Sequence, residues 1–303
     1  MTFSLTILGS NSAIPTLTRN PSAHLLNVNE RLFLIDCAEG TQLQIRKYHI
    51  HFQRIRRIFI SHLHGDHFFG LIGLLNSLHL LGRKEELHLY GPPLLKEILD
   101  LQLDASQTTL VYPLIFHLIS PAGYEMIYEN DTVTVHSFPL VHSIPTCGFI
   151  FREKKQLRKI RKDRIKDLQV PVSEMLNLKK GKDYADEQGE IHKNEDLTLD
   201  PPPSRSYVYC SDTVYTESII PYIQKADLLY HEATFMQDMT QIAHEKFHST
   251  TIEAATLAKK AGVKKLLIGH FSARYEDLQP LLDEARSVFP ETYLAEDGGK
   301  IQI

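Results

Sequence analysis

The sequence predicts an α/β fold in layers, interrupted by one inserted segment. Short apolar stretches that alternate like strands take turns with helical patterns along most of the 303 residues, and this rhythm occurs in two similar halves. Residues 152–203 break the rhythm, because they are rich in charge and end in three consecutive prolines. We therefore expect one domain made of residues 1–151 and 204–303, with residues 152–203 inserted as an arm.

The individual elements follow from the spacing of the apolar residues. Strands are expected at residues 3–8, 24–28, 32–36, 58–60, 87–90, 132–138, 207–210, 228–231 and 266–268. Helices are expected near residues 41–48, 68–81, 94–101 and 251–260. Ser249 or Thr250 can cap the last of these helices, which contains Glu253.

Polar residues stand where several of these strands end. They are Asp36, His62, Asp212, Glu232 and His270, each at or just after the end of an apolar strand. The carboxyl ends of strands in α/β sheets gather functional groups. We therefore expect these side chains to share one cleft.

Composition limits the class of protein. The hydrophobic content of 43% supports a large core, and no apolar stretch approaches the roughly 20 residues that span a bilayer. The start of the chain has no basic leader, and the three widely spaced cysteines form no C-x-x-C pair, so we expect a cytoplasmic location and buried free thiols. The net charge of −4 argues against diffuse attraction to a polyanion.

The strongest chemical signal is the run His62-Leu-His-Gly-Asp-His67. Alternation places His62 and His64 on one side of an extended chain, and Gly65 permits a turn that brings Asp66 and His67 back toward them. Imidazole and carboxylate ligands suit zinc, manganese or iron, and no cysteine is near enough in the sequence to close the site with thiolates. Open coordination positions indicate a catalytic metal.

Three later residues complete the set of predicted ligands: His142, Asp212 and His270 each follow an apolar run. Taken singly, each is as easily explained by a structural role. Together with the first cluster they make seven ligands, the number suited to two divalent ions that share a carboxylate, an arrangement used in displacement at phosphorus.

Two further motifs can supply acid-base chemistry, His231-Glu-Ala-Thr234 and His248-Ser-Thr250. A carboxylate such as Glu232 favours the charged form of a neighbouring imidazole, which suits His248 to protonate a departing alkoxide near neutral pH.

The arm carries a local basic patch, with nine lysines and arginines against two acids between residues 152 and 166. Leu157, Ile160, Ile165 and Leu168 are spaced so that a short helix would carry one weak apolar stripe under a basic face. The alternative is a solvated charged loop, which charge runs usually form.

These motifs resemble the metallo-β-lactamase superfamily and, within it, the ribonuclease Z family of tRNA 3′-processing endoribonucleases. The resemblance covers nearly the whole chain and includes residues 15–20 and Asp36-Cys-Ala-Glu-Gly-Thr-Gln42 as well as the motifs at residues 231–234 and 248–250. It implies a four-layer αββα metallo-β-lactamase sandwich with an inserted arm. The sequence departs from the family at Leu17, where a basic residue is usual, and its arm has no Gly-Pro-rich stretch.

The resemblance also implies roles for the residues. One zinc would be bound by His62, His64 and His142 and a second by Asp66, His67 and His270, with Asp212 bridging them and Mn²⁺ or another divalent ion as the alternative metal. Asp66 would orient or deprotonate the water that attacks precursor tRNA just beyond the discriminator nucleotide, leaving a tRNA 3′-hydroxyl and a 5′-phosphorylated trailer. In a homodimer the arm would grip the tRNA elbow. The expected substrate-binding residues are Arg19, Asn20, Arg158, Lys159, Arg161 and Lys162.

Three other interpretations stay open at this point. The nearest is a small-molecule hydrolase that acts on a phosphodiester, thioester or sulfate ester with the same metal pair, because folds are reused widely. A di-iron redox protein is disfavoured, since the histidine motif lacks the acidic residue usual in such sites and no flavin-binding domain is evident. An inactive RNA-binding module is disfavoured by the complete ligand set.

Overall fold

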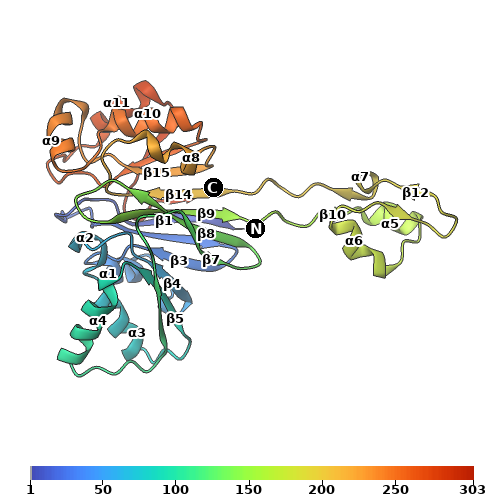
Figure 1. Ribbon diagram of the computed structural model, residues 1–303, viewed down its shortest axis with the longest axis horizontal. Coiled ribbons are helices and arrows are strands. Elements are labelled where there is room, and N and C mark those ends of the chain that lie inside the picture. Colours follow the sequence, from blue (N-terminus) through green and yellow to red (C-terminus); the bar gives the residue numbers. More distant parts are fainter. Residues whose placement is uncertain (1) are drawn as a thin grey trace. The chain divides into compact units, whose positions relative to one another are not determined.

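The computed structural model describes residues 2–303. Contacts divide the chain into two compact units (Figure 1), one formed by Met1–Arg152 with Arg205–Ile303 and the other by Glu153–Ser204. We call the first unit the body and the second the arm. None of the helices in residues 2–303 combines the length and the apolar character needed to cross a membrane.

The body contains two sheets of seven strands each. The first sheet runs in the order β18 (Lys300–Gln302), β1 (Phe3–Gly9), β2 (Ala23–Val28), β3 (Arg31–Ile35), β4 (Ile55–Phe59), β5 (Leu87–Gly91) and β6 (Leu114–Leu118). The second runs in the order β17 (Thr292–Leu294), β16 (Leu266–Gly269), β15 (Leu228–Glu232), β14 (Ser206–Cys210), β9 (Thr146–Glu153), β8 (Val133–Leu140) and β7 (Glu125–Glu129). Strands β3 to β6 are parallel, and so are β14 to β17, which brings the carboxyl ends of each set to a common edge.

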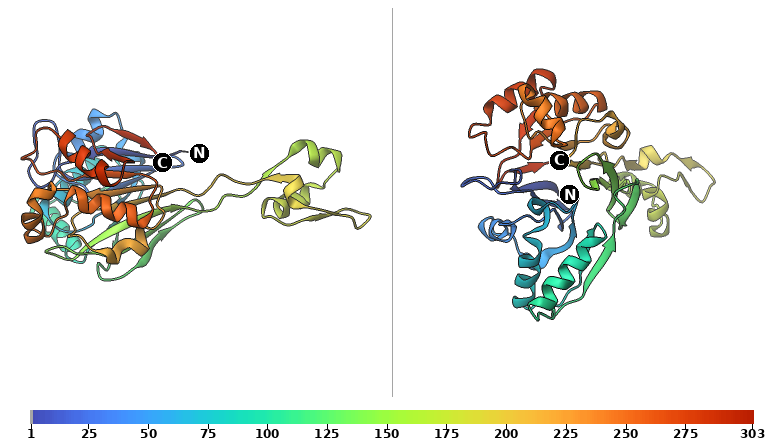
Figure 2. Two further views of the ribbon diagram at one scale, coloured as in Figure 1. Left: turned by 90° about the horizontal axis from the view of Figure 1, so that it is seen from above. Right: turned by 60° about the vertical axis from the view of Figure 1, so that its left-hand side comes forward.

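Helices cover the outer faces of both sheets, as Figures 1 and 2 show. The first sheet is covered by α1 (Thr41–Lys47), α2 (Gly65–Phe68), α3 (Leu71–Leu80) and α4 (Leu94–Ala105), with a 3₁₀ turn at Phe52–Arg54. The second is covered by α8 (Ile220–Ile223), α9 (Thr240–Glu245), α10 (Thr251–Ala261) and α11 (Gln279–Val288), with 3₁₀ turns at Glu217–Ile219 and Gln237–Met239. A third apolar cluster, which includes Phe33, Phe59 and Phe151, fills the space between the sheets. The predicted αββα sandwich is confirmed.

One predicted helix is wrong in its bounds. We expected a single helix over residues 68–81, but α2 ends at Phe68 and α3 begins at Leu71. At the break, Gly70 N donates to the carbonyl oxygen of Cys37 at 3.0 Å, and a Cβ on Gly70 would lie 1.9 Å from the carbonyl oxygen of Ala38. The chain therefore bends where a glycine lets it touch the loop after β3.

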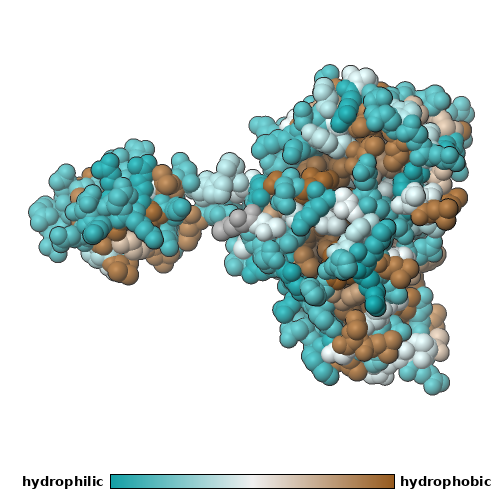
Figure 3. Space-filling model, turned by 180° about the vertical axis from the view of Figure 1, so that it is seen from behind, coloured by the Kyte–Doolittle hydropathy of each residue, from teal (hydrophilic) through white to brown (hydrophobic). Residues whose placement is uncertain are grey.

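The arm has its own short elements: β10 (Lys159–Ile160), α5 (Lys162–Asp167), a 3₁₀ turn (Val172–Glu174), α6 (Met175–Lys179), β11 (Tyr184–Ala185), β12 (Ile191–His192), α7 (Asn194–Leu197) and β13 (Thr198–Leu199). Ile165, Val170, Leu178, Tyr184 and Leu197 form a small core, so the interpretation as a solvated loop is wrong. Hydrophilic side chains cover most of the face of the arm seen in Figure 3.

The predicted apolar stripe in the arm is also wrong in part. Ile160 lies in β10, which pairs with β13 instead of joining a helix, so α5 begins only at Lys162. Leu157 precedes both elements and is 53% exposed. Ile165 is a buried member of the core of the arm, and Ile160 and Leu168 are partly buried and pack against that core.

Candidate metal centre

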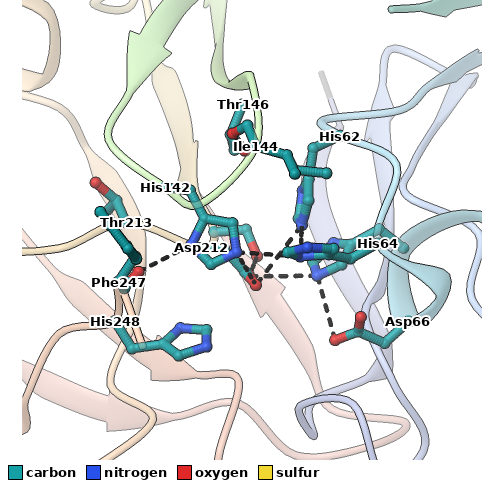
Figure 4. A network of polar contacts seen from close by, with 12 residues as sticks. His62, His64, Asp66, His142, Ile144, Thr146, Asp212, Thr213, Phe247 and His248 are labelled. Atoms are coloured by element: carbon teal, nitrogen blue, oxygen red, sulfur yellow. Dashed lines mark hydrogen bonds and ion pairs between the residues drawn. The ribbon is translucent and has the colours of Figure 1, made fainter. Parts of the chain in front are cut away.

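The seven predicted ligands come from four places in the body. His62 and His64 follow β4, and Asp66 and His67 lie in α2, which begins at Gly65 directly after them. The other three follow β8, β14 and β16, and they are His142, Asp212 and His270. Side chains from both sheets therefore meet, and Figure 4 shows His62, His64 and His142 around Asp212.

The first group consists of His62, His64, His142 and one oxygen of Asp212. His64 Nδ1 lies 3.2 Å from His62 Nε2 and 3.1 Å from His142 Nε2. Asp212 Oδ2 lies 3.7 Å from His62 Nε2 and 3.6 Å from His142 Nε2. Ligands that surround one ion tetrahedrally, with bonds of about 2.0–2.1 Å, lie roughly 3.3 Å apart, so these separations suit a shared cation.

The second group consists of Asp66, His67, His270 and the other oxygen of Asp212. Asp212 Oδ1 lies 3.2 Å from His67 Nε2 and 3.1 Å from His270 Nε2. Asp66 Oδ2 lies 3.4 and 3.3 Å from the same two nitrogens. Asp212 therefore belongs to both groups through its two oxygens.

Hydrogen bonds set which nitrogen of each ring carries the proton. His142 Nδ1 can only donate to the carbonyl oxygen of Phe247, 2.9 Å away. His67 Nδ1 donates to Asp36 Oδ2 at 2.7 Å. Both rings thus turn an unprotonated Nε2 toward the groups in their neutral form.

In His62 and His270, a hydrogen bond to a neighbouring hydroxyl group likewise sets which ring nitrogen carries the proton. Ser61 Oγ donates to Asp36 Oδ2 and so accepts from His62 Nδ1 at 3.0 Å. Thr234 Oγ1 donates to Glu232 Oε2 and so accepts from His270 Nδ1 at 3.0 Å. With these hydrogen bonds, the neutral form of each of the four imidazoles would present the lone pair of Nε2 to the groups, as metal ligands do.

The ionisation of these side chains also suits a cation. Burial and the neighbouring imidazoles lower the pKa of His62, and burial likewise lowers the pKa of His64 and His142. Burial opposes the ionisation of Asp66 and Asp212, but adjacent histidines hold the pKa of both carboxyls below the ordinary value. Neutral imidazoles and ionised carboxylates are the forms that bind metal.

His67 is the exception, and its surroundings show most clearly that these residues fit a cation. Burial lowers its pKa, but Asp212, Asp66 and Asp36 together raise it well above the ordinary value. Its Nε2 is fully buried and has no hydrogen-bond partner although it faces two carboxylates. A divalent ion between these groups would satisfy all three side chains, so the residues present fit the metal.

Asp36, which we expected in the cleft without assigning it a contact, belongs to the site, and so does Tyr209, for which we predicted no role. Asp36 accepts from Ser61 N at 2.8 Å and from the Tyr209 hydroxyl at 2.7 Å, in addition to its bond with His67. The position of Asp36 at a strand end was the available signal. Tyr209 gave none, because it has the sequence pattern of an ordinary buried strand residue.

Three residues at the site have a strained backbone. Asp36, Phe247 and His270 have φ values of 55°, 56° and 59°, in the left-handed region that costs side chains other than glycine about 1–2 kcal/mol. Asp36 and His270 each follow directly on a strand that ends at the site. Such outliers persist where the surrounding contacts hold them, often at functional sites.

Glu232 and His248 form a second polar pair beside the ligands. His248 Nδ1 lies 2.9 Å from Glu232 Oε1, which also accepts from Thr213 N at 2.7 Å. Burial lowers the pKa of His248, but Glu232 outweighs burial and raises it to about 9. The predicted cap is confirmed, since Thr250 and Glu253 form a capping box at the start of α10.

Arg19 and Asn20, two of the predicted substrate-binding residues, make hydrogen bonds within the body. Arg19 Nε donates to Asn11 Oδ1 at 3.0 Å, another guanidinium nitrogen donates to the carbonyl oxygen of Tyr275 at 2.6 Å, and Asn20 Nδ2 donates to Asp297 at 2.9 Å. These polar groups therefore hold their own loop. Its tip instead exposes Leu17 completely.

In the arm, the predicted basic residues fall into two kinds. Arg158 pairs with Asp200 and donates to Thr198 Oγ1 at 2.7 Å, so its guanidinium is engaged. Lys159 and Lys162 are exposed, and Arg161 is half-buried.

A cleft of about 780 Å³ opens over the two groups. His64, Asp66, His142, Asp212, His248 and His270 all line it. Exposed Lys246 and Arg274, together with Ile14 and Phe247, are also in its lining. The cleft can therefore place a charged ligand against the metal ligands and His248 at once.

Comparison with known proteins gives three findings. A family model described as "Anti-Pycsar protein Apyc1" matches residues 3–156. A curated ribonuclease Z of Bacteroides fragilis is 45% identical over 295 residues, which is 97% of each chain. The crystal structure of the short form of human tRNase Z is similar with a TM-score of 0.73 and 29% identity over 98% of each chain.

A further solved structure shows the fold alone. The metallo-β-lactamase fold protein YhfI of Bacillus subtilis superposes with a TM-score of 0.69 at 19% identity over the whole of both chains. The predicted metallo-β-lactamase sandwich is thereby confirmed. The family model covers the motif at residues 62–67 and His142, whereas the ribonuclease Z relative also spans Asp212, His248 and His270.

Proposed function

Because this chain belongs to the ribonuclease Z family, we propose that it is a metal-dependent endoribonuclease that removes the 3′ trailer from precursor tRNA. The observation that carries the proposal is the pair of histidine-carboxylate groups that share Asp212 in one cleft. Two such groups suit displacement at phosphorus, where the attacking and the leaving oxygen both need stabilisation. We also propose that the protein is cytoplasmic and forms a homodimer.

Two Zn²⁺ ions are the proposed cofactor, with Mn²⁺ as the alternative. The residues that would hold them are His62, His64 and His142 for one, Asp66, His67 and His270 for the other, and Asp212 for both. A bound divalent pair lowers the pKa of a coordinated water and neutralises charge on the phosphate.

The side chains then have distinct tasks. The Asp66 carboxylate, whose pKa is held low by His67, accepts a hydrogen bond from the attacking water and orients it. His248 donates a proton from Nε2 to the 3′-oxygen as the bond between phosphorus and that oxygen breaks. Glu232 holds the His248 ring through Nδ1. The products are a tRNA 3′-hydroxyl and a trailer with a 5′-phosphate.

The arm is proposed to bind the tRNA through its phosphates, with Lys159 and Lys162 as exposed contacts and Arg158 and Arg161 beside them. Such contacts carry no base specificity and weaken steeply with salt. Deletion of residues 152–203 is expected to abolish cleavage of precursor tRNA while hydrolysis of bis-p-nitrophenyl phosphate continues. Equal loss of both activities would show that the arm is structural.

The function itself is tested with a 5′-labelled precursor tRNA that carries a 3′ trailer. We expect the zinc-loaded protein to cut it once, beside the discriminator nucleotide, and Asp212→Ala to be inactive. An uncut precursor, combined with hydrolysis of bis-p-nitrophenyl phosphate, would instead identify a small-molecule phosphodiesterase.

A further inference from the structure

We propose that Phe247 is a binding residue for the substrate, on whose ring one of the two nucleobases next to the cleaved phosphate stacks. This inference rests on the proposed function and adds a contact that selects a nucleotide at the point of cleavage. It starts from an exposed aromatic ring in a cleft whose other functional side chains are polar.

The ring is exposed where the substrate must lie. Phe247 is 40% exposed and lines the same cleft as His142, Asp212 and His248. Its centroid lies 6.5 Å from that of the His142 ring, and the two planes are inclined by 85°. Part of this large apolar side chain is thus open to the cleft beside the candidate metal ligands, where a planar ligand can pack against it.

The backbone that carries the ring is held in place. Phe247 has a φ of 56°, a conformation that is strained for an aromatic residue. Its amide donates to the carbonyl oxygen of His244 at 3.1 Å, and its own carbonyl oxygen accepts from His142 Nδ1 at 2.9 Å. The next residue, His248, donates its amide to Ala243 at 2.8 Å. Contacts on both sides therefore fix the backbone from which the ring projects, relative to the reacting groups.

The rest of the rim fits the other parts of a nucleotide. Lys246 and Arg274 are exposed cations in the lining of the cleft, which also includes the exposed acid Glu245, and the two cations suit phosphate groups. An aromatic ring beside such cations is the usual platform for single-stranded nucleic acid, because every base has a face that can stack. The trailer junction of a precursor tRNA is single-stranded, so its bases are free to do so.

The test is a double-mutant cycle between the protein and the RNA. Phe247→Ala is compared with wild type on the normal precursor and on two precursors that are abasic, one at the discriminator position and one at the first trailer nucleotide. We expect Phe247→Ala to lose roughly 5- to 150-fold in kcat/KM. With the wild-type protein, one of the two abasic precursors should show a similar loss in kcat/KM. With Phe247→Ala, that precursor should be cleaved as fast as the normal one. Phe247→Trp should restore most of the activity.

Two controls separate stacking from a structural role. Phe247→Ala should bind zinc as tightly as wild type, because its carbonyl still bonds His142. Tyr293→Ala, which removes a ring that is 42% exposed outside the cleft, should cleave normally. The inference would be overturned if the effect of Phe247→Ala and the effect of the missing base were independent, so that they multiplied, at both abasic positions. Lost zinc affinity in Phe247→Ala would also overturn it. A wild-type protein that cuts no precursor would instead overturn the proposed function.

Discussion

Replacing Tyr209 with phenylalanine removes one hydrogen bond from the buried carboxylate that orients His67. The Tyr209 hydroxyl donates to Asp36 Oδ2 at 2.7 Å, and the same oxygen accepts from His67 Nδ1. Burial and Asp36 raise the pKa of Tyr209 well above its ordinary value, so the hydroxyl stays a donor throughout the working pH range. The phenylalanine ring can keep the stacking on Tyr230, where the two planes differ by only 6°.

The expected loss of zinc affinity depends on the hydrogen bonds that Asp36 keeps in the variant. A hydrogen bond to a charged group contributes about 1.5–3 kcal/mol, which corresponds to roughly 10- to 150-fold in an equilibrium constant. Asp36 keeps its bonds to Ser61 N, Ser61 Oγ and His67, so the carboxylate stays partly fixed. We therefore expect the lower end of the range, about tenfold weaker zinc binding, as is typical when a residue behind a ligand is changed.

The assay is competition for zinc against a chromophoric chelator, with the unfolding of the metal-free protein measured in parallel. Tyr207→Phe is the matched control, because Tyr207 lies on the same strand, is equally buried and bonds His24 Nδ1 at 2.8 Å instead of Asp36. Both variants should lose about 1–2 kcal/mol of stability, but only Tyr209→Phe should lose zinc affinity. Equal zinc affinity in both variants would refute the reasoning.

Three further predictions concern His248 and the cap of α10. His248→Ala should lower kcat on precursor tRNA by roughly 10²- to 10⁴-fold without changing the zinc content, and unchanged kcat would exclude the proton donor. Because Glu232 raises the pKa of His248 to about 9, the protonated form is kept at neutral pH and lost as the pH rises through that value, so activity should fall there. Glu232→Gln should move this fall in activity to lower pH in a pH-rate profile. An unchanged pH-rate profile would contradict the pairing of Glu232 with His248. Thr250→Ala removes the cap bonded to Glu253 and should reduce the free energy of unfolding by about 1 kcal/mol in denaturant titration, whereas no change would show that the capping box is not stabilising.

Much of the site was predictable because the signals were local. The run from His62 to His67 places four functional groups within one turn after a strand, and the strand ends that carry Asp212 and His270 lie at a common edge. The structure brings these side chains together, and their roles as metal ligands stay a prediction.

What the sequence could not predict depends on contacts between distant segments. Tyr209 reaches Asp36 from the other sheet, and nothing in the pattern of β14 distinguishes it from a core residue. Arg19 is positioned by carbonyl oxygens more than 250 residues away, contacts that the sequence does not indicate, and its assignment to the substrate stays a prediction. The break at Gly70 likewise depends on an approach to Ala38.

The candidate metal ligands are divided between the two sheets, and this affects how the sheets can separate. Asp66 and His67 follow a strand of the first sheet, whereas Asp212 and His270 follow strands of the second. Bound ions would therefore act as cross-links between the two halves of the chain, in a protein whose three cysteines are all free. Cross-links that close long loops lower the entropy of the unfolded chain most strongly. Bound metal would therefore stabilise the folded body against separation of its two sheets.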